Sequence, residues 1–384
     1  MAVTSTTVCF PACNLRILIT NRYLDIYGGT QVVVRDLAFE LRRQGHEPVV
    51  YSPESGKVAQ EIRSSGIVVV DKLSSLTGSF DIIHGHHDQA LEALLYFPSV
   101  PAVYVCHGVS ECVFYFPRIL RYVAVDEPCR KRIADVLAIT EELIEIIPNA
   151  IDLARFQPRG PLPSRPRRAL VFSNNAGPHT HLPVVRRACA QAGLELDVVG
   201  FGAGRPINDP ESILPGYDIV FAKARCALEA LAVGNAVVLC DCMGLGPMVS
   251  TRNFDDLRPM NFGYKTLVNA LQPRLIRAEI ERYDPAEAAL VSARVRHQSG
   301  IIEATQHWIN LYTQVINEFR GSKQNLDAEY RAIADCLSQW NYEKRIAWER
   351  QQLEKLRSVP IVGNVLHSAA RRILRRWTNG WGLS

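Results

Sequence analysis

Short apolar runs alternate with amphipathic segments along most of the chain. Residues 15–20, 101–106 and 236–240 are runs of aliphatic and β-branched side chains with the length of a strand. Such runs are typical of parallel strands that are buried on both faces. Between these runs, apolar residues recur at helical spacing, as in residues 31–44, which end at Gly45. The alternation therefore predicts an α/β protein with parallel sheets.

The first series of alternating segments occupies residues 1–158. Its predicted helices are at 31–44, 58–65, 89–95 and 127–137, and its predicted strands are at 15–20, 47–52, 66–70, 81–84, 101–106, 122–125 and 144–147. A strand, a glycine-containing loop and a helix, followed by another strand, form the opening unit of a doubly wound parallel sheet. We predict an N-terminal Rossmann-like domain over these residues.

A second series follows a segment rich in proline and arginine, residues 158–168, which we interpret as a linker. The predicted strands are at 169–173, 195–199, 218–221 and 236–240, and the predicted helices are at 182–192, 224–233, 274–282 and 285–298. We predict a second Rossmann-like domain over residues 168–300. In doubly wound parallel-sheet domains of this kind, ligands bind in the crevice at the carboxyl ends of the strands.

The remaining residues have helical patterns. Residues 301–320 predict one long amphipathic helix, and residues 321–384 predict a helical extension that is charged over 326–357. In residues 360–378, apolar side chains recur at helical spacing opposite four arginines. This pattern predicts a basic amphipathic helix on an anionic membrane surface. The alternative is a helix that packs on the body of the protein.

Composition narrows the functional classes. The 384 residues are 47% hydrophobic and 21% charged, and the formal net charge is only +4, which gives no case for a nucleic-acid partner. The ten cysteines show no C-x-x-C spacing, as expected of reduced thiols. A basic leader and an apolar run of about 20 residues are both absent from the sequence. We therefore expect a cytoplasmic protein that is peripheral on the inner membrane face.

The most informative stretch is residues 221–248. A run of helix formers at 224–233 ends at Gly234, and a predicted strand and a glycine-rich loop follow. Lys223 and Arg225 lie at the start of this helix, where unpaired N–H groups attract phosphate. Glu229 comes one turn after Arg225 and on a similar face. These residues predict a site for a nucleotide diphosphate and its ribose, and the alternative is an ordinary solvated amphipathic helix.

Histidines supply a second set of candidates. His107 follows a predicted strand and precedes Gly108, a position from which it could take a proton or hold a developing charge. The alternative is a structural histidine. His84, His86 and His87 have the chemistry of metal ligands, but no fourth ligand is suggested. Because no D-x-D pair occurs, we predict no metal and no cofactor, with the phosphates neutralised by the protein itself.

Four motifs together resemble one known group of enzymes. They are YGGTQ at 27–31, DIIHGH at 81–86 with VCHG at 105–108, IPNAID at 147–152 with Arg155-Phe156, and ALEALAVGNAVV at 227–238. In this order and spacing, residues 15–319 resemble the GT-B glycosyltransferases, specifically the retaining enzymes of family 4. The resemblance implies two Rossmann-like domains that face each other across a cleft, namely an acceptor domain over residues 1–158 and a nucleotide-sugar donor domain over residues 168–300. It also implies a final helix that crosses back onto the first domain.

The resemblance also implies roles for individual residues. The loop of Gly28 and Gly29 approaches the donor phosphate and the acceptor, His107 lies near the transferred sugar, and Glu229 matches the second acid of an E-x7-E motif that holds the donor ribose. The predicted catalytic residues are His107 and Glu229. The predicted donor-binding residues are Gly28, Gly29, Ser173, Asn174, Gly202, Lys223, Arg225 and Glu229, and the predicted acceptor-binding residues are Gly29, Thr30, His84 and His107.

The sequence departs from the family pattern at two places. Phe221 occupies the position of the first acid of E-x7-E, and residues 173–179 lack the lysine that helps the family to clamp the diphosphate. We expect Lys223 or Arg225 to supply that charge. The predicted activity is transfer of a hexose from a nucleotide-diphosphate sugar to a glycan or lipid-linked acceptor in polysaccharide or glycolipid synthesis. The alternatives are a non-catalytic GT-B-like sugar-nucleotide binding protein and a sugar-nucleotide epimerase.

Overall fold

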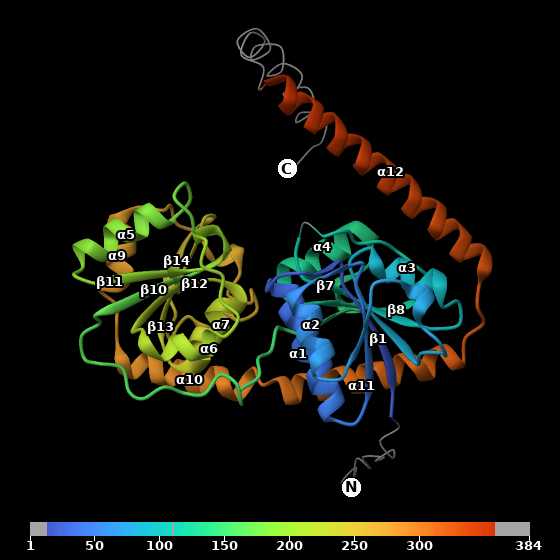
Figure 1. Ribbon diagram of the computed structural model, residues 1–384, viewed down its shortest axis with the longest axis horizontal. Helices are drawn as coiled ribbons and strands as arrows, with labels where there is room; N and C mark the ends of the chain where they lie inside the picture. The colour runs from blue at the N-terminus through green and yellow to red at the C-terminus, as the bar shows by residue number, and fades with distance from the viewer. Residues whose placement is uncertain (1–13, 110, 358–384) are drawn as a thin grey trace. The chain divides into compact units, whose positions relative to one another are not determined.

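The computed structural model describes residues 14–109 and 111–357 (Figure 1). The chain groups into two compact units, Met1–Lys323 and Gln324–Ser384. The described part of the first unit contains two large sheets, each with helices packed around it, and a small two-stranded sheet. The predicted α/β class is therefore confirmed, and the two sheets are described in turn.

The N-terminal sheet has seven parallel strands in the order β5-β3-β1-β6-β7-β8-β9. Their bounds are β1 (Arg16–Thr20), β3 (Glu47–Tyr51), β5 (Val68–Val70), β6 (Ile82–His86), β7 (Ala102–Cys106), β8 (Ile119–Ala124) and β9 (Ile144–Ile146). The helices of this half are α1 (Gly29–Arg43), α2 (Lys57–Ser64), α3 (Gln89–Tyr96) and α4 (Glu127–Leu137), and β2 (Tyr23–Leu24) pairs with β4 (Glu54–Ser55) beside the sheet. The buried aliphatic residues of β1 explain its place inside the sheet.

The second sheet has five strands in the order β11-β10-β12-β13-β14. Their bounds are β10 (Arg168–Phe172), β11 (Glu195–Val199), β12 (Ile219–Ala222), β13 (Ala236–Asp241) and β14 (Gly244–Met248). The helices are α5 (Leu182–Gln191), α6 (Pro210–Ile213), α7 (Ala224–Val233), α8 (Phe254–Leu257), α9 (Pro273–Ile280) and α10 (Pro285–Gln298). Both sheets match the alternation of apolar and amphipathic segments in the sequence, with strand ends shifted by one to three residues.

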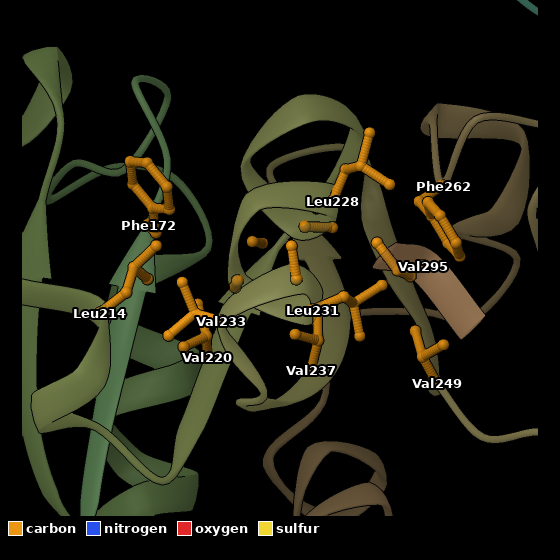
Figure 2. Close-up of a cluster of buried hydrophobic side chains, with 14 of the residues drawn as sticks. Phe172, Leu214, Val220, Leu228, Leu231, Val233, Val237, Val249, Phe262 and Val295 are labelled. Carbon is orange, nitrogen blue, oxygen red and sulfur yellow. The ribbon is translucent and has the colours of Figure 1, made fainter. Parts of the chain in front are cut away.

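Helix α7 is held in place by the largest apolar cluster of this half (Figure 2). Leu228 and Leu231 on the helix are buried with Val220 and Val237, which come from the adjacent strands. The helix ends at Gly234, whose φ of 100° is a conformation that favours glycine. The predicted bounds of this helix are confirmed. The packing of its apolar face against the core holds its N-terminal end in place.

The glycine-rich segment after β13 is a strand rather than the predicted loop. β14 pairs antiparallel with β13, so the second sheet is mixed. Gly246 explains this packing, since a Cβ added there would come within 2.7 Å of the Thr266 carbonyl oxygen. The glycines therefore permit close approach of backbones in a sheet, which the sequence pattern alone does not distinguish from a mobile turn.

The long helix α11 (Ile301–Arg320) follows α10 and lies along the N-terminal half, in contact with α1, β7 and β8 (Figure 1). Its entry is fixed by Ile301, whose N–H donates to the carbonyl of Ile151 at 2.9 Å. Trp308 and Tyr312 are buried on its inner face. Helix α11 thus brings aromatic side chains to the sheet of the first half.

The second compact unit begins at Gln324 and contains α12 (Leu326–Arg357), which confirms the predicted charged helix. The predicted membrane-binding segment, residues 360–378, lies outside the described residues. Among the helices that the structure describes, none is both long and apolar enough to cross a bilayer.

Candidate active site

A pocket lies between the two halves of the first unit, at the N-terminal end of α7. This interlobe pocket is lined by Gly28, Gly29, Arg155, Asn174, Arg225 and Glu229, among other residues, and has a volume of about 80 Å³. Gly28 and Gly29 lie at the start of α1, and Asn174 follows β10. Five of the eight predicted donor-binding residues, all of those named here except Arg155, therefore line a single pocket.

Arg225 is the central charge of this pocket. Its Nε donates to Glu229 Oε1 at 2.8 Å, its Nη2 donates to Asp36 Oδ2, and its Nη1 donates to the carbonyl of Ala150 at 3.2 Å. The side chain is only 7% exposed. Because Asp36 lies on α1 and Glu229 lies on α7, this one guanidinium joins the two halves. The predicted proximity of Arg225 and Glu229 is confirmed.

The carboxylates around Arg225 are themselves buried. Burial raises the pKa of Glu229, and the positive charge of Arg225 opposes that rise. Asp36 also accepts from Arg35, whose Nη2 lies 2.6 Å from Asp36 Oδ1, and Arg35 reaches Glu61 at 3.3 Å. The result is a continuous ion-pair network, and it closes one side of the interlobe pocket.

Arg155 is a cation of the pocket that the sequence did not identify as a binding residue. Its Nε lies 2.7 Å from Glu211 Oε1, and its Nη2 donates to the carbonyl of Asn208 at 2.7 Å. It comes from the turn after β9, within the motif whose Asp152 accepts from the N–H of residue 155. The sequence feature that could have identified Arg155 as a binding residue is the Arg155-Phe156 pair of that motif.

Lys223 has a different setting from Arg225. It is the N-cap residue of α7, and its Nζ lies 3.9 Å from Asp241 Oδ1. Asp241 also accepts from Ser173 Oγ at 2.8 Å and from Asn175 Nδ2 at 3.1 Å. Burial alone would raise the pKa of Asp241, but the hydrogen bonds from Cys242, Ser173 and Asn175 and the Lys223 charge lower it. Lys223 and Ser173 thus belong to a polar cluster at the carboxyl edge of the second sheet.

The other predicted ligand-binding residues surround this edge. Gly202 donates its N–H to the carbonyl of Asn174 at 2.9 Å. Asn174 in turn donates from Nδ2 to the carbonyl of Tyr27 at 3.2 Å, a contact between the two halves. Thr30 Oγ1 lies 3.2 Å from Gln31 Oε1. Thr30, Ser173, Gly202 and Lys223 do not line the interlobe pocket within the described part of the chain.

The backbone at the start of α7 has an unusual conformation. Ala224 has a φ of 48°, in the left-handed region, and its N–H donates to the carbonyl of Phe262 at 2.7 Å. A left-handed alanine is strained, and such positions often occur at functional sites. Phe221, at the position of the missing acid, is fully buried in the sheet core and is not among the described residues that line the interlobe pocket.

A second cavity adjoins the first at Arg225. This histidine cavity is lined by His84, His86, His107, Asn149, Trp308 and Arg225, among other residues, and has a volume of about 30 Å³. His107 Nε2 lies 3.0 Å from His86 Nδ1, and Tyr312 Oη lies 2.6 Å from His84 Nδ1. The predicted acceptor residues His84 and His107 therefore line the same cavity. His86 and residues of α11 line it as well. His86, which was considered only as a metal ligand, is fully buried inside β6.

Burial keeps these imidazoles neutral. It lowers the pKa of His84 and of His107 to about 3 in each case, and lowers that of His86 well below its usual value. Nearby Glu111 accepts the backbone N–H of His107 at 2.9 Å, and burial raises the pKa of this carboxyl to about 7. The cavity is therefore polar but uncharged at neutral pH, apart from the ion pair of Asp36 and Arg225 at its rim.

Comparison with known proteins agrees with this architecture. Residues 27–155 match the profile of Glycosyltransferase Family 4. Among solved structures, a glycosyltransferase from Rickettsia africae ESF-5 is similar over 79% of this chain and 99% of its own, with 14% sequence identity and a TM-score of 0.54. The chain therefore has the GT-B glycosyltransferase fold.

Two structures with lower similarity scores are similar over a comparable length. The catalytic domain of starch synthase IV from Arabidopsis thaliana, bound to ADP and acarbose, is similar over 79% of this chain and 100% of its own, with 12% identity and a TM-score of 0.47. A protein described as a UDP-N-acetylglucosamine 2-epimerase from Listeria monocytogenes is similar over 81% and 98%, with 12% identity and a TM-score of 0.48. A search of curated proteins finds no significant match.

Proposed function

We propose that this protein is a metal-independent glycosyltransferase that uses a nucleotide-diphosphate sugar. The observation that carries the proposal is the pairing of Arg225 with Glu229 in a pocket opposite the Gly28–Gly29 loop. A guanidinium and a helix N-terminus attract a diphosphate, and a carboxylate at the same place accepts from ribose hydroxyls. The match of residues 27–155 to Glycosyltransferase Family 4 supports the same activity.

Binding of a diphosphate requires the pocket arginines to change partners. Arg155 and Arg225 both contact carboxylates, namely Glu211 for the first and Asp36 and Glu229 for the second. We expect the phosphate oxygens to take over some of these N–H groups, while Glu229 turns to the ribose. The start of α7 adds the N–H groups of its first turn. Lys223, 27% exposed at that end, supplies long-range positive charge.

The chemical step breaks the bond between the anomeric carbon and the diphosphate oxygen. The electron pair leaves with the diphosphate, and the acceptor hydroxyl forms the new bond to the anomeric carbon. The acceptor proton passes to the released diphosphate. Negative charge grows on the leaving group during this step, so fixed positive groups stabilise the transition state more than the bound donor. Retention of configuration is inherited from the family 4 resemblance.

The acceptor is proposed to approach from the first half, past Gly29, Thr30 and the histidine cavity. A glycan or a lipid-linked sugar fits the expected basic segment at 360–378, which would hold the enzyme on the inner face of an anionic membrane. On this proposal the product belongs to polysaccharide or glycolipid synthesis.

The test is a comparison of nucleotide-sugar binding and turnover in three forms of the full chain. A thermal-shift screen of nucleotides and nucleotide sugars identifies the donor, because a ligand at 100 times its dissociation constant stabilises by about 2.7 kcal/mol. Release of nucleotide diphosphate is then measured for wild type, Glu229→Gln and Lys223→Ala. We expect each substitution to lower turnover about tenfold or more, equivalent to about 1.4 kcal/mol.

Glu281→Gln is the matched control, because Glu281 is a 64% exposed acid on the surface ion pair with Arg277. It should leave turnover unchanged. Wild-type turnover in both Glu229→Gln and Lys223→Ala would remove the site assignment, provided that all variants melt as wild type does.

A non-catalytic sugar-nucleotide binding protein is the second candidate. The observation that favours it is Phe221, a fully buried core residue at the position where the family has its first acid. Binding of a nucleotide sugar without hydrolysis or transfer to any offered glycan would support this candidate. Release of an isomerised sugar nucleotide without an acceptor would instead indicate an epimerase.

A further inference from the structure

The interlobe pocket in this conformation is too small for the donor that it is proposed to bind. Its volume is about 80 Å³, and a cavity needs about 10–15 Å³ to hold one water. Pockets that enclose a drug-sized ligand measure about 300–1,000 Å³, and a nucleotide sugar is a ligand of at least that size. The pocket must therefore widen before a nucleotide sugar enters, and the contacts that keep it narrow control this step.

A buried ion pair joins the two walls of the pocket. Arg225 Nη2 donates to Asp36 Oδ2, with Arg225 on α7 of the second half and Asp36 on α1 of the first half. The two side chains are only 7% and 6% exposed. Two hydrogen bonds to backbone carbonyls accompany the ion pair, from Arg225 Nη1 to Ala150 and from Asn174 Nδ2 to Tyr27, each at 3.2 Å. The pair therefore lies where separation of the halves would widen the pocket.

The arginines of the pocket wall are already neutralised by the protein. Three arginines line the pocket, namely Arg35, Arg155 and Arg225. Their ion-pair partners in the described part of the chain are four carboxylates, those of Asp36, Glu61, Glu211 and Glu229. A diphosphate would add negative charge to a network that already has one acid more than it has bases. One carboxylate must therefore leave before the anion binds.

Asp36 is the carboxylate that can leave Arg225 without losing its own compensation. Glu229 is four positions from Arg225 on the same helix, so it stays beside Arg225 when the halves separate. Asp36 moves away with α1 and keeps Arg35, whose Nη2 lies 2.6 Å from Asp36 Oδ1. Separation of the halves thus leaves each of these charges with a partner, which avoids the high cost of an uncompensated buried charge. The contact between Asp36 and Arg225 is therefore suited to break and form reversibly.

We propose that Asp36 regulates the donor site as an internal competitor of the donor diphosphate. The proposal rests on the proposed donor binding at Arg225 and names a control on that same site. While Asp36 holds Arg225, the halves stay together and the pocket stays narrow. When the halves separate, the guanidinium is released to the phosphate oxygens. The apparent affinity for a diphosphate is then the intrinsic affinity multiplied by the fraction of molecules in which Asp36 has left Arg225.

Asp36→Asn is the test variant, because it removes the competing charge and leaves Arg225 paired with Glu229. Glu40→Gln is the matched control, since Glu40 is a similarly buried acid one turn further along α1 and its partner Arg43 lies in the same half. Asp36→Glu keeps the charge, and Asp36→Ser replaces the asparagine variant if that variant does not fold. Calorimetric titration of the full chain with pyrophosphate, UDP, GDP and ADP measures affinity, and thermal melting shows that each variant is folded.

We expect Asp36→Asn to bind the best of these probes about tenfold more tightly than wild type does, or by about 1.4 kcal/mol. Damage to a binding site would lower affinity, so a gain identifies a competitor. Glu40→Gln and Asp36→Glu should show no gain. Separation of the halves is measured independently by hydrogen exchange of the Glu127 N–H, which donates to the Pro259 carbonyl of the other half at 3.1 Å. Without any added anion, this exchange should be about tenfold faster in Asp36→Asn than in wild type.

Wild-type affinity in Asp36→Asn, or an equal gain in Glu40→Gln, would overturn the competition at Arg225. Failure of the proposed function gives a different result, in which neither wild type nor any variant binds one of the four probes. Exchange of the Glu127 N–H then decides alone. Faster exchange in Asp36→Asn would support Asp36 as the residue that holds the halves together, and unchanged exchange would overturn this role.

Discussion

The interlobe pocket and the histidine cavity meet at Arg225, yet they handle buried polarity in opposite ways. The interlobe pocket keeps charged side chains charged by pairing every arginine on its wall with a carboxylate. The histidine cavity keeps its imidazoles neutral, because burial there lowers their pKa. The first arrangement suits an anion that exchanges partners, whereas the second holds uncharged rings.

The largest expected effect is on stability, from removal of the charge common to both sites. Arg225→Met leaves Asp36 and Glu229 buried without their shared cation, and breaking one partner of a buried ion pair costs about 3–5 kcal/mol. We expect the free energy of unfolding in urea to fall by that amount. The double variant Arg225→Met with Glu229→Gln should recover most of it, because Asp36 keeps its ion pair with Arg35 and Glu229 no longer carries a charge. A loss in Arg225→Met similar to that of a surface substitution would contradict the buried network.

The next largest effect is the loss of stability on acidification, which arises from the histidine cavity. His84 and His107 have a folded-state pKa of about 3 against an ordinary value of 6.5, so the unfolded chain binds more protons below pH 6.5. The free energy of unfolding should therefore fall as the pH drops from 6.5 towards 3, by about 1 kcal/mol per pH unit for each histidine.

Glu111 acts in the opposite direction, since its folded pKa of about 7 lies above the ordinary 4.5 and its contribution is lost as the pH rises through 7. Glu111 accounts for one extra proton in the folded state, whereas several histidines each account for one extra proton in the unfolded state. The free energy of unfolding therefore still rises with pH between pH 5 and 6.5. Urea unfolding at four pH values measures the slope, and His84→Gln should flatten it. A slope unchanged in that variant would show that His84 does not titrate as its burial implies.

A smaller effect, on nucleotide-diphosphate affinity, is expected from Arg155 in the interlobe pocket. Arg155→Gln removes one guanidinium from the interlobe pocket but leaves the Arg225 network intact. We expect nucleotide-diphosphate affinity to fall about tenfold, or about 1.4 kcal/mol, as for loss of one charge-assisted contact. Calorimetric titration measures the change. Arg168→Gln is the control, because Arg168 pairs with Asp197 on an exposed surface. Equal affinities in both variants would show that Arg155 has no part in phosphate binding.

The smallest effect concerns the strained start of α7. Ala224 has a φ of 48°, where glycine has no steric penalty, so Ala224→Gly should stabilise the fold by about 0.5–1 kcal/mol. Thermal melting of the variant measures the gain. Ala230→Gly, in the middle of the same helix, is the control and should destabilise by about 1 kcal/mol. Destabilisation in both variants would show that the left-handed conformation is not strained.

Sequence pattern predicted the fold well because parallel strands buried on both faces give continuous apolar runs. Residues 224–233 were predicted with the observed bounds, since Gly234 ends the helix and helix formers fill it. β14 was missed because its glycines resemble a loop, whereas they allow close backbone contact with the segment around Thr266. Helical spacing likewise predicted that Arg225 and Glu229 would meet, because both lie on one helix.

Contacts between segments far apart in the sequence could not be predicted from residue spacing. Asp36 is 189 positions from Arg225, and the ion pair between them joins the two halves. Asn149, Trp308 and His86 line one cavity through the same long-range folding. The predicted roles of His107, Lys223 and Glu229 in chemistry remain predictions for the experiments above.

The antiparallel strand β14 has a consequence for how copies of this protein behave at high concentration. An exposed strand edge is a template on which another chain can add its own strand, the first step towards fibrous aggregates. Here the outer edge exchanges backbone hydrogen bonds between Leu245 and Asn269, each at 2.9 Å, and Pro247 has no N–H to offer. The β14 edge of this sheet is therefore a poor template for a strand from another copy of the protein.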